Sequence, residues 1–464
     1  MHNVTPTSTA EIDSRDVGLS VRLDGVRTSV LARNVAIVGV VALLLGVIRL
    51  RTPSIWVDES FTARAMESSV FRYIDGYHWL YYSVTKPWTL VAGTSEWALR
   101  MPSVFGAMFA CALLVVLAHK LFGQWVGLVS GLLLAINPFF VQWSQQARGY
   151  TLLVAVSLLA TILLIRALES GSRGAWALYG LAFSAVLVWH PVAGLLLVPA
   201  QAVLIYQRRG RVLPHGVLAA ILICALGVPW AAQIAMRSTG EGVAMNWLDA
   251  PSGEVALRAL LDVSGAVGVG LLLAVVGVGV LRRAGKTELA VWLGAWAFAP
   301  FLVSLLITVV RPVYLDRYLI VAAPAFALLA GVAIVGIGFR MRAAVGLAVV
   351  AATSVGLVLW YSEGDGGNWR GEDWRSAVAA VGERRGESEA VVVAPWSANP
   401  AATFYGARVS DTSTADSIWV LTWSETGDEL MVADRTGLGF GEHRLVERLR
   451  FGWRVNAELW KREP

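Results

Sequence analysis

The 464 residues of this chain are 56% hydrophobic and only 15% charged, whereas typical soluble domains have about 25% charged residues. The mean hydropathy is +0.61. A soluble fold needs more polar residues than this to cover its surface, and a disordered chain would be poor in apolar residues and rich in charge. The composition therefore excludes both classes and indicates a polytopic membrane protein.

A transmembrane helix needs about 20 mainly apolar residues, and eleven runs are candidates. They lie at 34–50, 102–118, 125–142, 150–167, 175–189, 191–206, 216–235, 258–281, 289–310, 318–338 and 343–361. The first 33 residues are polar and of mixed charge, and they contain no short apolar core of a signal peptide. They are therefore typical of a cytoplasmic tail.

The basic residues between the spans predict the orientation, because cytoplasmic loops are enriched in Lys and Arg. With the N-terminus inside, all five inside loops carry positive charge, at 119–120, 166–173, 207–211, 282–286 and 340–342. The odd number of spans then places the C-terminus outside. The chain divides into a cytoplasmic tail (1–33), a transmembrane region (34–361) whose first outside loop is 51–101, and an extracytoplasmic region (362–464).

Three outside segments are long enough to hold structure, at 51–101, 237–256 and 362–464. The last of them contains alternating helix and strand signals. We expect a helix at 373–385, buried strands at 390–393 and 417–421, and a closing hairpin at 444–460. This pattern predicts a small α/β domain on the extracytoplasmic side.

Two adjacent carboxylates, Asp58 and Glu59, stand just past the first span. Charged groups so close to lipid are costly and need a partner or a function. One of them can act as a general base that takes a proton from an acceptor hydroxyl. The alternative is structural, with the pair capping a helix over 61–73, and the dipeptide alone favours this second interpretation.

The same loop continues with His78, Tyr81, Tyr82 and Lys86. Two tyrosines followed by a lysine suit a phosphate anchored at the membrane surface, with aromatic rings against a lipid or a sugar. The alternative is an interfacial aromatic belt with a lysine whose ammonium group reaches the water. Taken alone, the segment favours the alternative.

Two later outside turns carry arginine beside tyrosine. Arg148 and Tyr150 stand at the start of the fourth span, and Arg317 and Tyr318 at the start of the tenth. Arg148 can pair with an acid of the first loop or bind a phosphate, and guanidinium groups suit both tasks. Arg317 can instead pair with Asp316. The convergence of acids, cations and aromatic rings on one face describes a site that holds an anionic lipid head and deprotonates a hydroxyl.

This pattern resembles the GT-C glycosyltransferase superfamily, and within it the protein O-mannosyltransferases and the bacterial aminoarabinose transferases of lipid A (glycosyltransferase family 39-like). The resemblance is carried by Asp58-Glu59, the run from Glu96 to Ser103, the turn from Ser144 to Tyr150, and Arg317-Tyr318. It implies an α-helical polytopic membrane protein of about eleven transmembrane helices with a small C-terminal extracytoplasmic α/β domain.

The resemblance also implies an activity in the plasma membrane. The donor would be a polyprenyl-phosphate sugar, and mannose or another hexose or pentose would pass with inversion to a glycan, lipid or protein of the cell envelope. Asp58 would be the general base, and Glu59 would position the acceptor or neighbouring cations. The donor phosphate would be held by Lys86, Arg148 and Arg317. The groove for sugar and lipid would be lined by His78, Tyr81, Tyr82, Tyr150 and Tyr318.

We expect no required cofactor, because two acids alone do not specify a metal site, although they are compatible with a divalent cation. We expect membrane lipids and no nucleic acid as further partners. A transporter of lipid-linked sugars or polysaccharides is the competing hypothesis, and it would need polar residues at mid-membrane depth. The spans carry almost no charge there, which favours chemistry at one face. A sensory or scaffolding protein is a third hypothesis.

Overall fold

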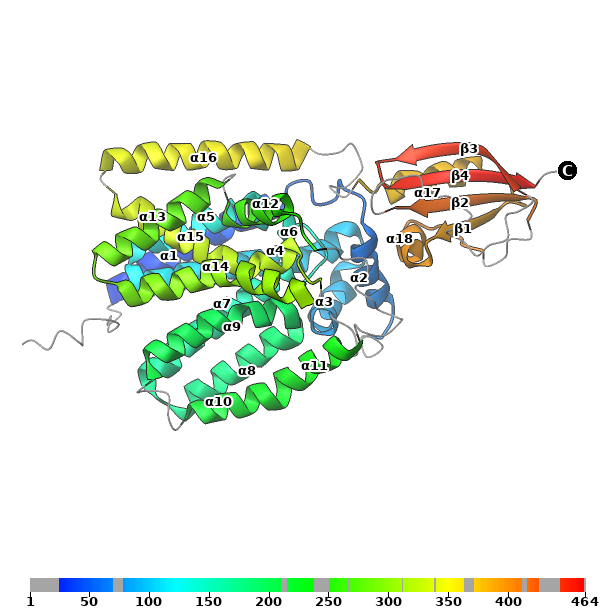
Figure 1. Ribbon diagram of the computed structural model, residues 1–464. Helices are drawn as coiled ribbons and strands as arrows, with labels where there is room; N and C mark the ends of the chain where they lie inside the picture. The colour runs from blue at the N-terminus through cyan, green and yellow to red at the C-terminus, as the bar shows by residue number, and fades with distance from the viewer. Residues whose placement is uncertain are drawn as a thin grey trace, which may run out of the picture.

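The computed structural model describes residues 25–69, 78–209, 215–237, 250–265, 268–310, 312–337, 339–362, 371–410, 415–424 and 443–462. A bundle of long helices forms most of the molecule, and a small sheet covered by helices lies beyond one end of the bundle (Figure 1). This arrangement confirms the predicted fold class. Most of the expected N-terminal tail and of the 237–256 loop lies outside the described residues.

Seven stretches of the described residues are long and apolar enough to cross a membrane, or nine if each of two bent helix pairs is one span. They comprise α1 (Gly25–Val47), α4 (Glu96–Phe122), α7 (Tyr150–Ser170), α10, η3 and α11 (Gly216–Leu222, Ile223–Gly227 and Val228–Arg237), α14 (Thr287–Val310), η5 with α15 (Asp316–Ala322 and Ala323–Gly336), and α16 (Phe339–Ser362). Two shorter apolar helices, α8 (Arg173–Trp189) and α9 (Pro191–Gln207), occupy the predicted fifth and sixth spans. A multi-pass membrane protein is confirmed, whereas the count of eleven spans stays a prediction.

Two runs that were predicted as single spans are bent. The run 125–142 forms α5 (Gln124–Ala135) and α6 (Pro138–Ser144), which meet at 63°. Pro138 opens the second helix, where its missing N–H costs nothing, and the Asn137 side chain accepts a hydrogen bond from the backbone N–H of Phe139. The run 258–281 forms α12 (Gly253–Ser264) and α13 (Val269–Arg283), which meet at 70°. Gly265 and Gly268 flank this break with φ of +84° and +86°, a conformation that glycine adopts readily.

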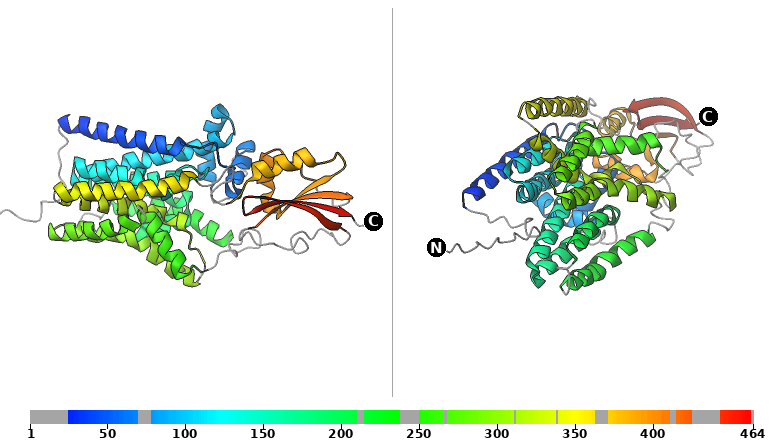
Figure 2. Two further views of the ribbon diagram at one scale, coloured as in Figure 1. Left: turned by 90° about the horizontal axis from the view of Figure 1, so that it is seen from above. Right: turned by 60° about the vertical axis from the view of Figure 1, so that its left-hand side comes forward.

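Ion pairs join four of the five predicted inside loops in two pairs, and these loops lie at the end of the bundle away from the sheet (Figure 1). Lys120 forms an ion pair with Glu169, and Arg208 lies 3.4 Å from Glu288. The short helices α2 (Val57–Glu67) and α3 (Trp79–Ala92) of the first outside loop lie at the other end, between the bundle and the sheet (Figures 1 and 2). The two groups of loops are therefore segregated as predicted, while the cytoplasmic identity of the first group stays a prediction.

The C-terminal α/β region, residues 371–462, contains a four-stranded sheet. Its elements are α17 (Trp374–Arg384), β1 (Ala390–Ala394), η6 (Trp396–Ala398), α18 (Asn399–Phe404), β2 (Ser417–Trp423), β3 (His443–Phe451) and β4 (Val455–Arg462). The strand order is β1-β2-β4-β3, with β1 parallel to β2 and the other pairs antiparallel. The helix, the two buried strands and the hairpin are thus confirmed close to their predicted positions.

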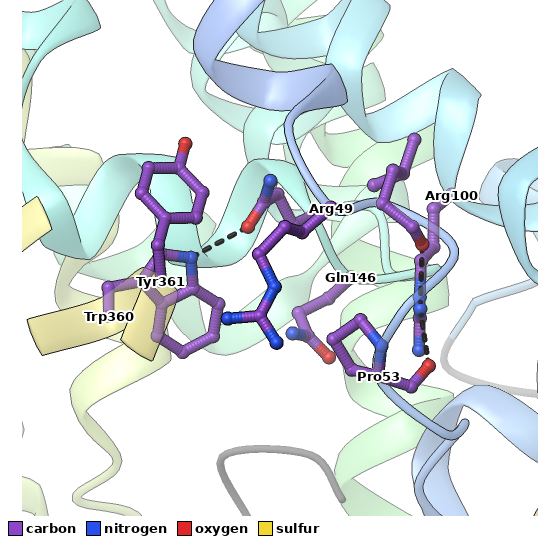
Figure 3. Close-up of a pocket in the computed structure, with 8 residues that line it drawn as sticks. Arg49, Pro53, Arg100, Gln146, Trp360 and Tyr361 are labelled. Atoms are coloured by element: carbon purple, nitrogen blue, oxygen red, sulfur yellow. Dashed lines mark hydrogen bonds between the residues drawn. The ribbon is translucent and has the colours of Figure 1, made fainter. Parts of the chain in front are cut away.

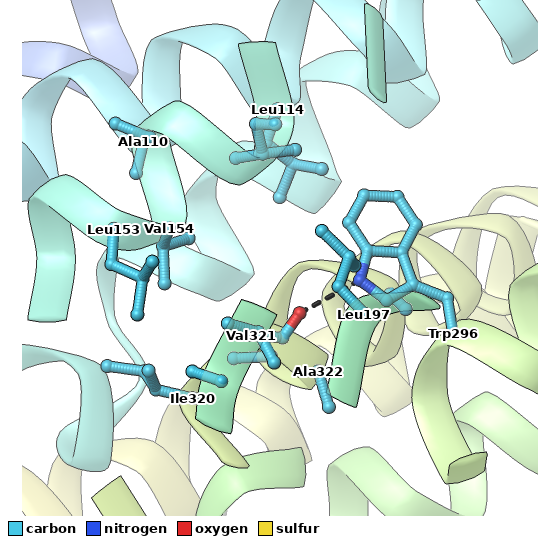
Figure 4. Packing of buried hydrophobic residues seen from close by; sticks show 14 of the residues in the cluster. Ala110, Leu114, Leu153, Val154, Leu197, Trp296, Ile320, Val321 and Ala322 are labelled. Atoms are coloured by element: carbon cyan, nitrogen blue, oxygen red, sulfur yellow. Dashed lines mark hydrogen bonds between the residues drawn. The ribbon is translucent and has the colours of Figure 1, made fainter. Parts of the chain in front are cut away.

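The apolar core of the bundle fixes the backbone that leads out to Arg317. Ile320, Val321 and Ala322 of η5 are fully buried among side chains of α4, α7, α9 and α14 (Figure 4). The Trp296 indole N–H donates a hydrogen bond of 2.8 Å to the carbonyl of Val321. Because the second half of this 3₁₀ helix is packed in the core, Arg317 in its first turn is held at the end of the bundle that faces the sheet.

Candidate active site

Asp58 lies in the first turn of α2 and faces two arginines from distant parts of the chain. Its Oδ2 atom is 3.7 Å from Nη2 of Arg148 and 3.8 Å from Nη2 of Arg317. The Asp58 side chain is 27% exposed, whereas each arginine side chain is only 8% exposed. The structure therefore brings together three of the predicted site residues, and the carboxylate is the most accessible of them.

The first turn of α2 begins earlier than predicted. The helix starts at Val57 and not at residue 61, and it ends at Glu67 with Ser68 as its C-cap. Residues 70–73 of the expected helix lie outside the described residues. Asp58 and Glu59 are themselves helical, because two acids are favoured in a first turn by the helix dipole. Successive residues of a helix point about 100° apart, so the two acids face different surroundings.

Glu59 is completely buried and is paired with Arg100. Nε and Nη2 of Arg100 donate to its two carboxylate oxygens at 2.8 and 2.7 Å, and the backbone N–H of Ala147 donates to Oε1 at 2.7 Å. The remaining N–H groups of Arg100 donate to the carbonyls of Leu50, Pro53 and Ser54. This geometry makes the pair neutral and fully hydrogen-bonded. It gives Glu59 a positioning role that ties α2 to α4 and to the turn before Arg148.

The turn that carries Arg148 is held from three sides. The carbonyls of residues 147, 148 and 149 accept hydrogen bonds of 2.8 Å from Thr62, Ser103 and Trp189, respectively. The position of Gly149 leaves no room for a side chain, because an added Cβ would lie 2.5 Å from Nε1 of Trp189. The backbone of the turn is therefore fixed by α2, α4 and α8, and the direction of Arg148 is fixed with it.

His78 is a neutral partner of Arg148. Nη2 of Arg148 donates to Nε2 of His78 at 2.6 Å, and Nη1 donates to the backbone carbonyl of Asp58 at 3.1 Å. Because a guanidinium group cannot accept a hydrogen bond, the imidazole nitrogen is the acceptor. Burial, followed by the fields of Arg148, His190 and Arg317, holds the pKa of His78 well below its usual value. His78 therefore adds no charge to the site at neutral pH.

The two site arginines have spare hydrogen-bonding capacity. In the part of the chain that the structure describes, the buried Nε atoms of Arg148 and Arg317 have no hydrogen-bond partner. The closest ion pair of Arg317 is the 3.8 Å approach to Asp58, in contrast to the saturated guanidinium of Arg100. A buried cation with unmet hydrogen bonds is costly to keep, so this arrangement is suited to receive an anion.

The net charge of the site also favours the binding of an anion. Glu59 and Arg100 neutralise each other, and His78 is uncharged. Asp58 then opposes both Arg148 and Arg317, so these three side chains together carry one positive charge in excess. A phosphodiester carries one negative charge and accepts hydrogen bonds from guanidinium groups, so it matches the charge and the unmet donors.

Aromatic rings surround the two arginines. The centroid of the His190 ring lies 4.4 Å from that of Tyr318, 5.9 Å from that of Tyr150 and 6.2 Å from that of His78. The ring centroids of Tyr82 and His78 are also 6.2 Å apart. His190 was not among the predicted site residues. The signal that could have found it is a titratable residue between two apolar runs, which in a membrane protein is a candidate for function.

Lys86 and Tyr81 have other surroundings than predicted. Nζ of Lys86 donates to the carbonyls of Met66 and Ser68 at the end of α2, where a cation offsets the negative end of the helix dipole. No contact among the described residues links it to the two arginines, and its predicted phosphate contact stays a prediction. Tyr81 is 1% exposed and packs behind the site, with its hydroxyl 3.4 Å from Oγ of Ser103.

A small cavity lies on the other side of Arg100 (Figure 3). Arg49, Gln146, Trp360 and Tyr361 are among the residues that line its volume of about 20 Å³. This space holds about one water molecule and is too small for a sugar phosphate. The Trp360 indole donates to the Gln145 side chain at 2.6 Å, so the cavity is a packing feature where α16 meets the end of α6.

Among the described residues, no group of three or more His, Cys, Asp or Glu side chains is arranged to hold a metal ion. Asp58 faces cations on two sides, and Glu59 is saturated by Arg100. The expectation that no metal is required stays a prediction.

Comparisons with known proteins bear on the fold and on one segment of the sequence. Residues 80–232 match the family model of dolichyl-phosphate-mannose-protein mannosyltransferases, a stretch that includes Tyr82, Arg148 and His190. ArnT from Cupriavidus metallidurans in the apo state has a TM-score of 0.63 at 14% identity, over 94% of this chain and 98% of that chain. The same protein bound to undecaprenyl phosphate has a TM-score of 0.62 at 14% identity, over 93% and 98%. No curated protein sequence matches the chain.

The likeness to ArnT extends over nearly the whole of both chains, including the C-terminal α/β region, and at 14% identity it shows the fold. The family match adds a sequence signal within the segment that carries the turn of Arg148. The chain therefore has the GT-C fold, and its predicted resemblance to the protein O-mannosyltransferase and ArnT group is confirmed.

Proposed function

We propose that the chain is a glycosyltransferase that moves a sugar from a polyprenyl phosphate to an acceptor hydroxyl at the outer face of the plasma membrane. The observation that carries this proposal is the pair of buried, incompletely hydrogen-bonded guanidinium groups of Arg148 and Arg317 beside the accessible carboxylate of Asp58. The structure of ArnT bound to undecaprenyl phosphate, which shares this fold, supports a lipid phosphate as the donor.

In the proposed step, the acceptor oxygen attacks the anomeric carbon of the sugar. The bond from that carbon to the phosphate oxygen breaks as the new bond forms, and its electron pair leaves with the polyprenyl phosphate. The hydroxyl proton passes to the carboxylate of Asp58, which acts as the general base. A single displacement from the opposite face inverts the configuration at the anomeric carbon.

The two arginines act on the leaving group. A polyprenyl-phosphate sugar is a diester with one negative charge, and the departing phosphate monoester gains a second one. Fixed donors that are already in place where charge develops lower the barrier without reorganisation. Arg148 is held by Asp58 and His78, and Arg317 by the buried turn behind it, so both are preorganised for this task.

The other side chains position the reactants. Glu59 fixes the helix that presents Asp58. The sugar and the first prenyl units lie against His78, Tyr82, Tyr150, His190 and Tyr318. Mannose, or another hexose or pentose, is the transferred sugar, and the acceptor is a glycan, lipid or protein of the cell envelope. Lys86 steadies the end of α2, and Tyr81 supports the ring of Tyr82 from behind, 6.1 Å away.

The proposal is tested by transfer from a panel of labelled polyprenyl-phosphate sugars in membranes that contain the protein. The variant Asp58→Asn is expected to lose a factor of about 10²–10⁴ in rate, the usual contribution of a general base. Glu169→Gln, which removes a partly exposed acid at the opposite end of the bundle, is the matched control and should transfer normally. Undiminished transfer by Asp58→Asn would refute the assignment of the base.

A further inference from the structure

Glu372 is a buried carboxylate of the C-terminal α/β region that contacts the start of α2. It is 0% exposed, and its Oε2 atom accepts a hydrogen bond of 2.9 Å from the backbone N–H of Val57. The same oxygen accepts a second bond of 2.9 Å from the indole N–H of Trp374. Val57 and Glu372 are 315 residues apart in the chain, so this contact joins two distant parts of the molecule immediately before Asp58.

The N-terminus of α2 needs an acceptor from elsewhere. The first N–H groups of a helix have no partner within the helix, and the residue before the helix commonly supplies one through its side chain. Here that residue is Trp56, whose indole can only donate. Glu372 supplies the acceptor for the first helical N–H in its place.

Two other side chains of the C-terminal region hold the chain segment that leads into α2. The hydroxyl of Tyr405 accepts a bond of 2.8 Å from the backbone N–H of Ile55. Arg375 donates to the carbonyl of Thr52 at 3.0 Å, and its other terminal nitrogen donates to Glu96 at 2.7 Å. Residues 52–57 are therefore held by three side chains of the C-terminal region.

Apolar contacts also join the start of α2 to the C-terminal region. Val57 belongs to the buried core of the α/β region, together with Trp374, Trp419 and Leu421, and Phe61 packs against that core. The first turn of α2 is thus packed on the C-terminal region on one side. On the other side, Glu59 bonds to Arg100 in the bundle. A shift of the C-terminal region would move the backbone of Asp58.

We propose that Glu372 is a positioning residue for Asp58: by accepting the Val57 N–H, it fixes the first turn of α2 so that the Asp58 carboxylate faces Arg148 and Arg317. The inference rests on the proposed function and assigns the C-terminal region a part in the reaction centre. The buried position supports this assignment, because an enclosed carboxylate is costly and burial raises the pKa of Glu372 to about 7.

Three variants of the full-length protein test the proposal. Glu372→Ala removes the acceptor, and Glu372→Gln keeps a carbonyl oxygen in the same place. Glu458→Ala is the matched control, because Glu458 is 1% exposed and bonds to the Trp460 indole and to Arg448 within the sheet. It removes a buried, indole-bonded carboxylate from the same region without touching α2.

Two quantities are measured, the rate of sugar transfer at saturating donor and the hydrogen exchange of peptides that cover residues 55–67. Glu372→Ala is expected to lose about tenfold or more in transfer rate, since small displacements of a reacting group have effects of this order. Its 55–67 peptides should exchange faster than those of the wild type. Glu372→Gln should restore both quantities to within a few-fold, and Glu458→Ala should leave the exchange of 55–67 unchanged.

The outcomes separate this proposal from the proposed function. If the wild type transfers sugar and Glu372→Ala transfers it as fast as Glu458→Ala, the positioning role is overturned. Equal exchange of residues 55–67 in the wild type and both Glu372 variants overturns it as well. If the wild type transfers none of the sugars in the panel, the proposed function fails, and the exchange measurement alone decides whether Glu372 fixes α2. Should Glu372→Ala fail to fold, Glu372→Leu takes its place, because it fills the space but cannot accept the Val57 N–H; exchange of residues 55–67 at the wild-type rate in that variant overturns the positioning role.

Discussion

Replacing Glu59 with glutamine separates a positioning role from a catalytic one. The substitution keeps the size of the side chain and removes its charge. It leaves the guanidinium group of Arg100, which is 2% exposed, without a counterion. The new amide group also directs N–H donors at a site that already has donors from Arg100 and Ala147.

The expected loss of stability is large. Removing one partner of a buried ion pair typically costs about 3–5 kcal/mol, because the other charge stays buried. The double variant Glu59→Gln/Arg100→Gln should be less destabilised than the sum of the two single variants, since it leaves no unpaired charge. The measurement is the midpoint of unfolding of the purified protein in detergent, with Glu169→Gln as the control for loss of a partly exposed acid.

The opposite pattern would refute this reasoning. If Glu59→Gln unfolds at the same temperature as Glu169→Gln and loses only sugar transfer, then Glu59 acts on the substrate. Its position next to Asp58 in the sequence is compatible with such a role. Additive effects of the two single variants would show that the 2.7 Å ion pair is not what holds the two residues.

Four further predictions follow from particular contacts. Arg317→Gln should weaken binding of undecaprenyl phosphate by about 10–100-fold, the value of a charged hydrogen bond of roughly 1.5–3 kcal/mol, and unchanged binding would remove Arg317 from the phosphate site. Gly149→Ala should lower the initial rate of transfer, because the new Cβ meets Trp189, whereas Gly174→Ala has open space and should not; equal rates would contradict the role of the turn. Stability should fall as pH rises from about 4.5 through about 7, because the pKa of Glu372 is raised in the folded protein and its protonated form is the favoured one there; the melting temperature of Glu372→Gln should lack this contribution, and identical pH profiles would argue against it. Lys86→Met should cost up to about 1 kcal/mol at the end of α2 and leave the KM for the donor unchanged, while a large rise in that KM would restore Lys86 to the phosphate site.

The sequence predicted the location of the site because the cost of charge in a membrane limits where charged residues occur. Charges are rare in a membrane chain, and Asp58, Arg148 and Arg317 stand at loops on the same predicted side, so their convergence could be inferred. The bend at Pro138 has a local signal, because proline favours the first position of a helix and follows Asn137, a good N-cap residue. The break at Gly265 could not, since the apolar pattern runs on across it.

The different roles of the adjacent residues Asp58 and Glu59 could not be predicted from the sequence. Asp58 and Glu59 differ because one turn of helix points them to different partners, and the partner of Glu59 is Arg100, 41 residues away. Lys86 is close in sequence to the aromatic residues of the site, yet it reaches back to the end of α2. Glu372 comes from a region without a recognised motif, so its contact with Val57 depends on how the two parts of the molecule pack.

The most direct test of the proposed function is a density map of the purified protein with bound polyprenyl phosphate. We expect the phosphate within about 3 Å of guanidinium nitrogens of both Arg148 and Arg317, the distance of a charged hydrogen bond, with the Asp58 carboxylate on the side from which an acceptor approaches. A phosphate bound elsewhere, with the two arginines still paired only with Asp58, would contradict the assignment of this site.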